Sequence, residues 1–524
     1  MTRRAAALLA LLAGGAALIS GVTMLDGIQP NDEGVMLAAA ARIAHGEVPY
    51  RDFWWFYPPG QPYLLALLWK AFGPSLLTWR ILRVATDAAV AVLAYLLARR
   101  GGASPRLALA VWLAAALAMA YPSGPHPFAL TLAFSLGALL LFEQRPTAAG
   151  VLAGLAAAWR LESAAYLVAG IALAGAWSAW STGGARMHAR SFARAFGRFA
   201  VPALGVALAL YAPVVAAAGL GRSWHLLVRY PLVQWSDYQS LPFPFSYGGP
   251  LNTSSIGGFL SDSAENLLVF YLPLVLVVGL AASLVALGLR ARELERLHIA
   301  TVVVALGAAH YLLVRPDVFH TASLAVMVAV LATWAVRGAR SLAAVVAAAG
   351  AAASIAYATV EGLDRRWLEL RADRDALRLP AADGVRVAPA VARPLEGAVR
   401  YVRARVPPGD PIYVATRRSD LVTSGDGLFY VLAGRPNATP YDIQAPGVVT
   451  TVAVQREIIG DLDRSRTRVV VRWTSPVTAA AEPDRAGRPS GVTLLDAYLA
   501  RTYRRAAAFG SYVILERRAR SGTA

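Results

Sequence analysis

The chain contains no cysteine in its 524 residues, and Lys70 is its only lysine. The absence of cysteine excludes a disulfide framework and a thiolate metal site. Charge is scarce as well: 16% of the residues are charged, whereas a soluble domain normally carries about 25%. Hydrophobic residues make up 57% of the chain, and the mean hydropathy is +0.49. This composition excludes a purely soluble protein and indicates a membrane protein.

The formal net charge of +18 comes almost entirely from arginine. The arginines form short clusters between apolar runs, which is the pattern of cytoplasmic loops under the positive-inside rule. No basic stretch alternates with aromatic residues in a stacking arrangement, so we expect no nucleic-acid binding. The sequence also has no convincing internal repeat and no Gly-rich phosphate loop.

Residues 1–358 consist mostly of long apolar runs, and a helix needs about 20 apolar residues to cross a bilayer. The first run is expected to be an uncleaved span rather than a signal peptide, because no clear cleavage site precedes Asp26. The fifth run is too short to cross alone, and we expect a tilted or broken helix there. The pattern predicts about eleven spans, near residues 5–24, 76–98, 107–121, 128–144, 147–159, 163–180, 199–219, 266–289, 298–314, 320–336 and 341–358.

The loops between these spans alternate in positive charge. The loop at 121–127 has no arginine or lysine, whereas every second loop carries arginines: Arg99, Arg100, Arg106, Arg145, Arg186, Arg190, Arg194, Arg198, Arg290, Arg292, Arg296, Arg337 and Arg340. The positive-inside rule then places the N-terminus in the cytoplasm. An odd number of spans places residues 359–524 on the outer side.

Two long segments fall on that outer side, at 25–75 and 220–265. The first contains an aromatic run around Trp54 and an expected amphipathic helix at 60–72, which suits the membrane interface. Long loops in a compact fold are usually functional or disordered. These two are too aromatic to be disordered, so we expect them to be functional.

Residues 359–524 form the second expected domain, which follows the membrane domain of residues 1–358. After a polar helical linker at 361–379, the chain alternates between the two periodicities of helix and strand. Buried strands are expected at 411–416, 468–473 and 512–516, and helices at 396–405, 452–463 and 494–505. The sequence therefore predicts a polytopic α-helical membrane protein with a C-terminal extracytoplasmic α/β domain.

Two adjacent carboxylates, Asp32 and Glu33, directly follow the first span. The apolar helix expected at 35–44 would draw them toward the bilayer surface. One carboxylate could act as a general base while its neighbour orients the acceptor. The alternative is that both are simply solvated at the interface.

Charged residues also interrupt or begin the apolar spans. Arg160 and Glu162 break a long apolar stretch, and because charge inside a membrane is costly, such residues usually face a cavity and pair with one another. They could equally be an internal ion pair that fixes the helix break. Arg80 and Arg83 lie one turn apart at the start of the second span, where they either extend toward the interface or bind a phosphate.

A compact group, Arg315, Asp317 and His320, lies at the outer end between the ninth and tenth spans. Arginine offers a bidentate fork for phosphate, histidine can supply a hydrogen bond or a proton, and the aspartate can orient either neighbour. Lone histidines are more often structural. A metal site would need more clustered acids than these.

The first outer segment resembles that of the C-type (GT-C) membrane glycosyltransferases, and most closely the protein mannosyltransferase and lipid A aminoarabinose transferase superfamily. The matching residues are Asp32-Glu33-Gly34, the alanines of 39–41, Gly46, Pro49-Tyr50, Asp52 and Tyr57-Pro58-Pro59-Gly60. The later Arg-x-Asp-x-x-His pattern, together with the stretches at 434–441 and 455–462, looks like uncharacterised bacterial members. Only the first outer segment matches the sequence motifs of the family strongly.

The resemblance implies an inverting glycosyltransferase, transferring a hexosyl or pentosyl group from a polyprenyl-phosphate donor to an extracytoplasmic lipid, glycan or protein. It implies that an acid of the first outer segment is the base, with Asp32 as first choice and Glu33 next. The donor and acceptor would be bound by Arg80, Arg83, Arg160, Arg315, Asp317, His320, Asp52 and Tyr57. A second outer-segment aspartate of some relatives is missing, so either Glu162 takes its role or the role is absent.

The same resemblance implies a multi-pass protein of the bacterial inner membrane that contributes to glycan biosynthesis in the cell envelope. We expect no cofactor and no metal requirement, with a divalent cation left open. Two other functions stay open from the sequence: a transporter or flippase of lipid-linked glycans, and a non-catalytic envelope scaffold. A transporter would favour polar residues along a central path and two repeat-related halves, and neither is evident.

Overall fold

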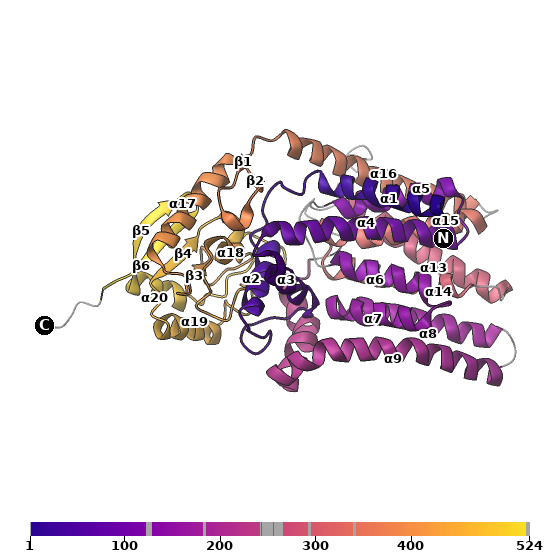
Figure 1. Cartoon of the computed structure of the whole chain (residues 1–524), viewed down its shortest axis with the longest axis horizontal. Helices are drawn as coiled ribbons and strands as arrows, with labels where there is room; N and C mark the ends of the chain where they lie inside the picture. Colours follow the sequence, from indigo (N-terminus) through magenta and orange to yellow (C-terminus); the bar gives the residue numbers. More distant parts are fainter. Residues whose placement is uncertain are drawn as a thin grey trace.

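A bundle of long helices joins a smaller α/β unit at one end of the molecule (Figure 1). The computed structural model describes residues 2–121, 128–181, 185–241, 243, 255, 266–291, 295–338 and 342–519. Parts of the loop at 121–127 and of the second outer segment, including its Pro/Gly-rich region, lie outside these residues, as do Arg292 and Arg340.

The bundle contains helices at each of the eleven segments expected to span. They are α1 (Arg3–Gly21), α4 (Leu76–Arg100), α5 (Pro105–Ala120), α6 (Phe128–Leu141), α7 (Pro146–Trp159), α8 (Leu161–Ser181), α9 (Ala185–Ala218), α13 (Leu272–Ala291), α14 (Arg296–Val314), α15 (Ala322–Gly338) and α16 (Leu342–Arg371). Seven helices in the described part are long and apolar enough to cross a membrane, and α5, α6, α7 and α15 are shorter apolar helices. The chain is therefore a multi-pass membrane protein, and eleven crossings stay a prediction.

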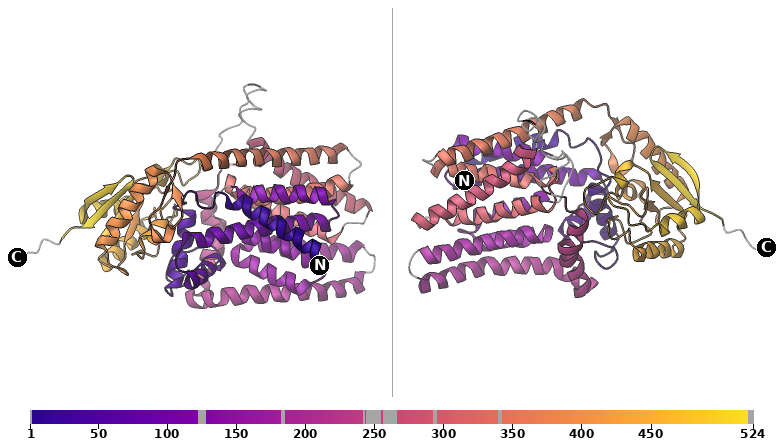
Figure 2. Two further views of the ribbon diagram at one scale, coloured as in Figure 1. Left: turned by 45° about the horizontal axis from the view of Figure 1, so that its top comes forward. Right: turned by 180° about the vertical axis from the view of Figure 1, so that it is seen from behind.

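Helix α4 ends at Arg100, and α5 begins at Pro105, at the end of the bundle where α1 begins, far from the α/β unit (Figures 1 and 2). There Arg100 pairs with Glu143 at 2.6 Å, and the Nη2 of Arg296 donates to the hydroxyl of Ser178 at 2.7 Å. These arginines lie at the end that the positive-inside rule predicts to face the cytoplasm. Which end faces the cytoplasm stays a prediction.

Helix α7 packs tightly against α9 through two glycines. A Cβ at Gly150 would lie 2.1 Å from the backbone oxygen of Phe199, and one at Gly154 would lie 2.6 Å from that of Ala203. Small residues allow such close approach in membrane helices. Because α7 is held in this way, its C-terminal end at Trp159 places the following Arg160 at the outer end of the bundle.

The two outer segments carry short helices rather than irregular loops. The first contains α2 (Asp32–Ala44) and α3 (Gly60–Phe72), and α3 coincides with the expected amphipathic helix. The second contains α10 (Leu220–Trp224), a π-helix (His225–Trp235) and α11 (Ser236–Gln239), and a further π-helix (Asn266–Tyr271) leads into α13.

The C-terminal unit is built around a four-stranded sheet in the order β3-β4-β6-β5. Strands β3 and β4 are parallel, and the other two pairings are antiparallel. Its elements are β1 (Asp375–Ala376), β2 (Arg386–Val387), α17 (Pro389–Arg405), β3 (Tyr413–Ala415), α18 (Leu428–Ala433), α19 (Val452–Arg464), β4 (Val469–Trp473), α20 (Leu494–Thr502), β5 (Tyr503–Phe509) and β6 (Tyr512–Arg517), with 3-10 turns at Pro380–Ala382 and Pro476–Ala479. A further 3-10 turn, at Val318–His320, lies in the bundle between α14 and α15.

The expected α/β alternation is present, with errors at several boundaries: the linker helix expected at 361–379 ends at Arg371, and the helix expected at 396–405 begins at Pro389. The helix expected at 494–505 ends at Thr502, and residues 503–509 form the edge strand β5. The alanines and arginines of this stretch favour a helix by intrinsic propensity. Pairing with β6 outweighs that preference, since β5 is hydrogen-bonded along most of its length.

The first outer segment and the C-terminal unit share one hydrophobic core, which includes Trp55 and Phe429. Polar contacts reinforce the junction: Arg42 pairs with Asp442 at 2.5 Å, and the backbone N–H of Trp54 donates to the backbone oxygen of Pro440 at 2.8 Å. Helix α16 runs across the boundary expected at 358/359. The first outer segment and the C-terminal unit therefore form one packed layer at this end of the bundle.

Helix α2 meets the C-terminal unit backbone to backbone. A Cβ at Gly34 would lie 2.2 Å from the backbone nitrogen of Leu428, and that nitrogen donates to the backbone oxygen of Pro30 at 3.1 Å. Only glycine fits at position 34 without moving one of the two segments. This contact fixes the N-terminal end of α2.

We expect Gly34→Ala to destabilise the protein by about 1–3 kcal/mol, because overpacking forces the backbones apart. The measurement is the apparent Tm of the purified protein in detergent. Gly14→Ala in α1 is the control, since nothing lies within 4 Å of a Cβ there. Equal melting temperatures for the two variants would contradict the close contact.

Asp426, which precedes α18, is buried and accepts hydrogen bonds from the hydroxyl of Tyr512 at 2.9 Å and from the N–H of Phe429 at 3.0 Å. Burial raises the pKa of Asp426 from 3.8 to about 7, although the bond from Tyr512 lowers it. Between these pH values the folded protein keeps a proton that the unfolded chain has lost, so stability falls as pH rises.

We therefore expect Asp426→Asn, which is neutral at every pH, to flatten the decline in apparent Tm between pH 4 and about 7. Melting curves across that range make the comparison. Asp410→Asn, at an exposed position of the same unit, should keep the wild-type slope. A wild-type slope in Asp426→Asn would show that this carboxyl is not the group that titrates.

Candidate functional site

Asp32 is the first residue of α2, where the aligned peptide dipoles of a helix favour a negative charge. Its Oδ1 accepts a hydrogen bond from the amide of Asn31 at 3.1 Å. Water can reach the side chain, yet surrounding protein raises the pKa of the Asp32 carboxyl from 3.8. The two observations fit a carboxyl that touches water on one side while protein displaces bulk solvent around it.

Three residues that are distant from Asp32 in the sequence lie close enough to it to affect the pKa of its carboxyl. Asp317 raises the pKa of Asp32, whereas Arg315 and His320 lower it, after the larger effects of burial and of Asn31. These residues follow α14, so the fold brings together two segments almost 300 positions apart. The expected group at 315–320 and the expected acid at 32 form one cluster.

Arg315 is held from at least three sides. Its Nε donates to Asp317 at 3.1 Å, and its Nη1 donates to both the backbone oxygen and the side-chain oxygen of Gln239, at 2.8 and 3.0 Å. On the third side lie Glu482 at 3.4 Å and Asp484 at 3.9 Å, both from the C-terminal unit. The guanidinium is thereby fixed at the junction of three segments.

His320 is oriented by Asp317, whose Oδ1 lies 2.5 Å from its Nδ1. The same oxygen accepts the N–H of Phe319 at 3.0 Å. The ring of Tyr311 lies 4.5 Å from that of His320, and it also stacks on Phe128 at 4.5 Å. Asp317 therefore orients both of its neighbours in the motif, as the sequence suggested.

Arg160 joins this cluster through Tyr311. It pairs with Glu162 at 2.9 Å, and its guanidinium lies 4.7 Å from the centre of the Tyr311 ring. Tyr57, from the first outer segment, has its pKa raised by burial and by Asp32, while Arg160 and Arg315 lower it. The phenol thus lies within electrostatic range of the acid and both arginines.

Glu33 and Arg80 pair with one another instead of joining the cluster. The two side chains form a fully buried bidentate contact at 2.7 and 2.8 Å, and Arg80 also donates to the backbone oxygens of Met24 and Gly27. Since both partners are buried and used in this pair, we reassign them to holding the first outer segment against α4.

Arg83 also has a partner within the bundle. It pairs with Asp87 at 3.2 Å and donates to the backbone oxygen of Met119 at 3.1 Å. The hydroxyl of Ser20 donates to the same Asp87 at 2.6 Å. This network ties α1, α4 and α5 together, which favours a structural role over phosphate binding.

Asp52, expected to bind substrate, instead closes a turn. Its Oδ2 accepts the N–H of Val48 at 2.7 Å, and it pairs with Arg51 at 2.8 Å. The intervening Tyr50 has a positive φ of 68°, and its hydroxyl donates to the backbone oxygen of Tyr57 at 2.6 Å. The strained turn thereby positions Tyr57, so Asp52 contributes to the site indirectly.

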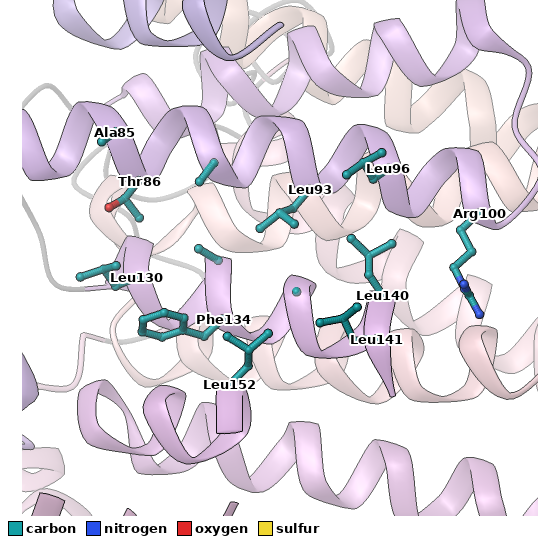
Figure 3. Close-up of a pocket in the computed structure, with 13 residues that line it drawn as sticks. Ala85, Thr86, Leu93, Leu96, Arg100, Leu130, Phe134, Leu140, Leu141 and Leu152 are labelled. Carbon is teal, nitrogen blue, oxygen red and sulfur yellow. The ribbon is translucent and has the colours of Figure 1, made fainter. Parts of the chain in front are cut away.

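An apolar cavity of about 750 Å³ lies between α4, α6 and α7 (Figure 3). Leu93, Leu96 and Leu130 line it, with Thr86 near one end and Arg100 at the other. Fourteen residues of helix between these two ends correspond to about 21 Å. Phe134, which lines the cavity, has its ring 5.5 Å from that of Trp159, the residue before Arg160 in the chain.

Sequence reasoning missed four members of the cluster: Tyr311, Gln239, Glu482 and Asp484. Tyr311 is in the last turn of α14, four residues before Arg315, which directly follows the helix. Helical spacing could therefore have indicated Tyr311. The other three come from α11 and from the C-terminal unit, and no local pattern marks them. In the described residues, no group of three or more histidine, cysteine, aspartate or glutamate side chains could hold a metal ion.

Comparisons with known proteins add little to this geometry. No protein-family model and no curated protein matches the chain. Among solved structures, arabinofuranosyltransferase AftD from Mycobacteria is similar, with 14% identity and a TM-score of 0.46 over 99% of this chain and 40% of that one. The chain spans less than half the length of that protein. Similarity at this level assigns neither an activity nor a substrate.

The raised pKa of Asp32 leads to a pH prediction. A base must be deprotonated, so any reaction that uses Asp32 as base should lose activity as pH falls, with a midpoint above 3.8. Asp317→Asn removes a neighbouring negative charge and should move this midpoint to lower pH. The pH profile of kcat/KM measures both. A midpoint that does not move would separate Asp317 from the titration of Asp32.

Proposed function

We propose that this protein is an inverting glycosyltransferase of the GT-C type, which transfers a sugar from a polyprenyl-phosphate donor to an extracytoplasmic acceptor. The observation that supports it most is the cluster around Asp32. One carboxyl with a raised pKa lies within electrostatic range of Arg315, His320 and Tyr57. A base next to fixed cations suits a reaction that removes a proton and releases a phosphate.

In the proposed reaction, the carboxylate of Asp32 takes the proton of the acceptor hydroxyl or amine. The acceptor atom attacks the anomeric carbon of the sugar from the face opposite the phosphate. The bond between that carbon and the phosphate oxygen breaks, and its electron pair stays on the phosphate. Attack from the opposite face inverts the anomeric centre.

The released phosphate needs positive charge that is already in place. Arg315 and Arg160 are proposed to supply it, because preoriented charges stabilise a developing anion without reorganising. His320 and Tyr57 would add hydrogen bonds, and Glu162 would orient Arg160 through their 2.9 Å contact. No metal or cofactor takes part in this proposal.

The lipid chain of the donor is proposed to occupy the apolar cavity of Figure 3. Its lining is leucine, alanine, Phe134 and Gly137, apart from Thr86 and Arg100 at the ends, so it favours a hydrocarbon over a polar guest. The cavity lies beside α7, whose end carries Trp159 and Arg160. A lipid there would have its phosphate near the cluster.

The same proposal places the cluster and the C-terminal unit outside the inner membrane, with the N-terminus in the cytoplasm. A transporter of lipid-linked glycans is supported less well. It would need polar groups along a central path, whereas most charged residues of the described helices, apart from the Arg83–Asp87 pair, lie toward the two ends of the bundle. A scaffold would have no need of a carboxyl held beside cations.

The decisive variant is Asp32→Asn, assayed for glycan product at matched protein level. We expect a loss of about 10²–10⁴-fold in kcat, the range for removing a general base, with an unchanged apparent Tm. Asp410→Asn, the same substitution at an exposed position of the C-terminal unit, should keep most activity because Asp410 has no part in the cluster. Normal product from Asp32→Asn would contradict the enzymatic proposal.

Glu33→Gln gives a contrasting result. It breaks a buried ion pair, and leaving one buried charge without its partner costs about 3–5 kcal/mol. We therefore expect less folded protein, with the surviving fraction active. Full stability combined with lost activity would instead return Glu33 to the catalytic role expected from the sequence.

A further inference from the structure

A tight loop of the C-terminal unit, residues 482–487, reaches the candidate site. Its two acids face Arg315, with Glu482 Oε1 at 3.4 Å from Nη2 and Asp484 Oδ2 at 3.9 Å from Nη1. Both acid side chains are largely buried, at 14% and 3% exposed. The loop is therefore part of the site and not a surface feature near it.

The loop has a defined shape. Asp484 Oδ1 accepts the N–H groups of Ala486 and Gly487 at 2.9 and 3.4 Å. A Cβ at Gly487 would lie 2.3 Å from the backbone of Glu482, so the turn requires glycine there. The N–H of Ala486 donates to the backbone oxygen of Tyr238 at 3.0 Å, which docks the loop on α11. The acids are thus held in place beside the arginine.

The contacts of Arg315 differ in length. Those to Asp317 and Gln239 are between 2.8 and 3.1 Å, whereas those to Glu482 and Asp484 are 3.4 and 3.9 Å. Coulomb attraction weakens with distance, and 3.4 and 3.9 Å are longer than a good N–H···O hydrogen bond, so these two contacts hold the guanidinium least firmly. The two acids of the loop are therefore the partners that another anion could replace at the lowest cost.

Negative charge is concentrated around Arg315. Asp317, Glu482 and Asp484 all approach this one guanidinium, and Asp32 lies within electrostatic range. Burial raises the pKa of Glu482, Arg315 lowers it, and Asp484 raises it again. A phosphate arriving at Arg315 would meet these negative charges and compete with them for the same donors.

We propose that Glu482 and Asp484 are counter-ions of Arg315 that an anionic lipid headgroup displaces, so that the C-terminal unit sets the affinity of the membrane site for its donor. The inference rests on the proposed function, since it takes Arg315 as the group that binds the donor phosphate. It gives the C-terminal unit a role in donor selection. A carboxylate that competes with the substrate weakens substrate binding, so neutralising it should tighten binding. Neutralising a merely structural contact would not.

The test is a binding measurement with farnesyl phosphate, a short polyprenyl phosphate, on the full-length protein in detergent without acceptor. Glu482→Gln keeps the size of the side chain and removes its charge. We expect about fivefold tighter binding, because one carboxylate that competes with the phosphate for Arg315 has lost its charge. Glu516→Gln is the matched control. Glu516 lies on β6, has the same charge as Glu482 and pairs with Arg405 and Arg504. The Glu516→Gln variant should bind farnesyl phosphate with the affinity of the wild type.

Unchanged or weaker binding by folded Glu482→Gln would overturn the inference, as would an equal gain in Glu516→Gln, which would reflect net charge alone. If Glu482→Gln fails to fold, Glu482→Asp replaces it, because the shorter side chain withdraws the carboxylate by one methylene. This variant should bind farnesyl phosphate about twofold tighter than the wild type. An unchanged affinity would count against the inference. The assay needs no turnover, so it can fail while transfer by the wild type is intact. No binding by any form would contradict the donor itself and this inference with it.

Discussion

The close packing of α2 against the loop before α18 is the constraint on which the candidate site depends. Gly34 lets the two backbones touch, and the amide oxygen of Asn31 accepts the N–H of Gly425 at 3.4 Å. Asp32 lies between these two contacts in the chain. Its position is therefore set by the C-terminal unit as much as by the membrane helix that precedes it.

The charged residues at the outer end of the bundle divide into two groups by their partners. Glu33 with Arg80, and Arg83 with Asp87, are buried pairs that hold helices and the first outer segment together. Asp32, Arg160 and Arg315 lie in the other group, at the meeting point of separate segments. Burying a charge is costly unless it is paired, so the first group stabilises this architecture, while the second combines partial pairing with access to water.

The parts of the structure that depend on local pattern could be predicted from the sequence. Apolar runs of about 20 residues and the amphipathic helix at 60–72 gave the helices of the bundle and α3, because burial in lipid or at its interface leaves a periodic signature. The carboxyl at Asp32 and the arginine at Arg315 stood out for the same reason, as charges beside apolar spans. Their spatial proximity was outside the reach of a local pattern.

What the sequence could not indicate is how acids and bases pair across the fold. Glu33 and Asp32 are neighbours in the chain, yet one is buried against Arg80 and the other is reached by water. The contribution of Glu482 to the environment of Arg315 joins residues 167 positions apart. Such pairing follows from the packing of the C-terminal unit on the outer segments, which no spacing along the chain encodes.

The central claim is that the acid at the start of α2 and the arginine after α14 act on one lipid-borne phosphate. A cryo-EM structure of the protein with farnesyl phosphate bound tests this most directly. The account predicts the phosphate at hydrogen-bonding distance from Arg315 or Arg160, with its lipid chain directed toward α4, α6 and α7 and Asp32 facing the same space. A phosphate bound at the opposite end of the bundle, beside Arg100, would contradict it.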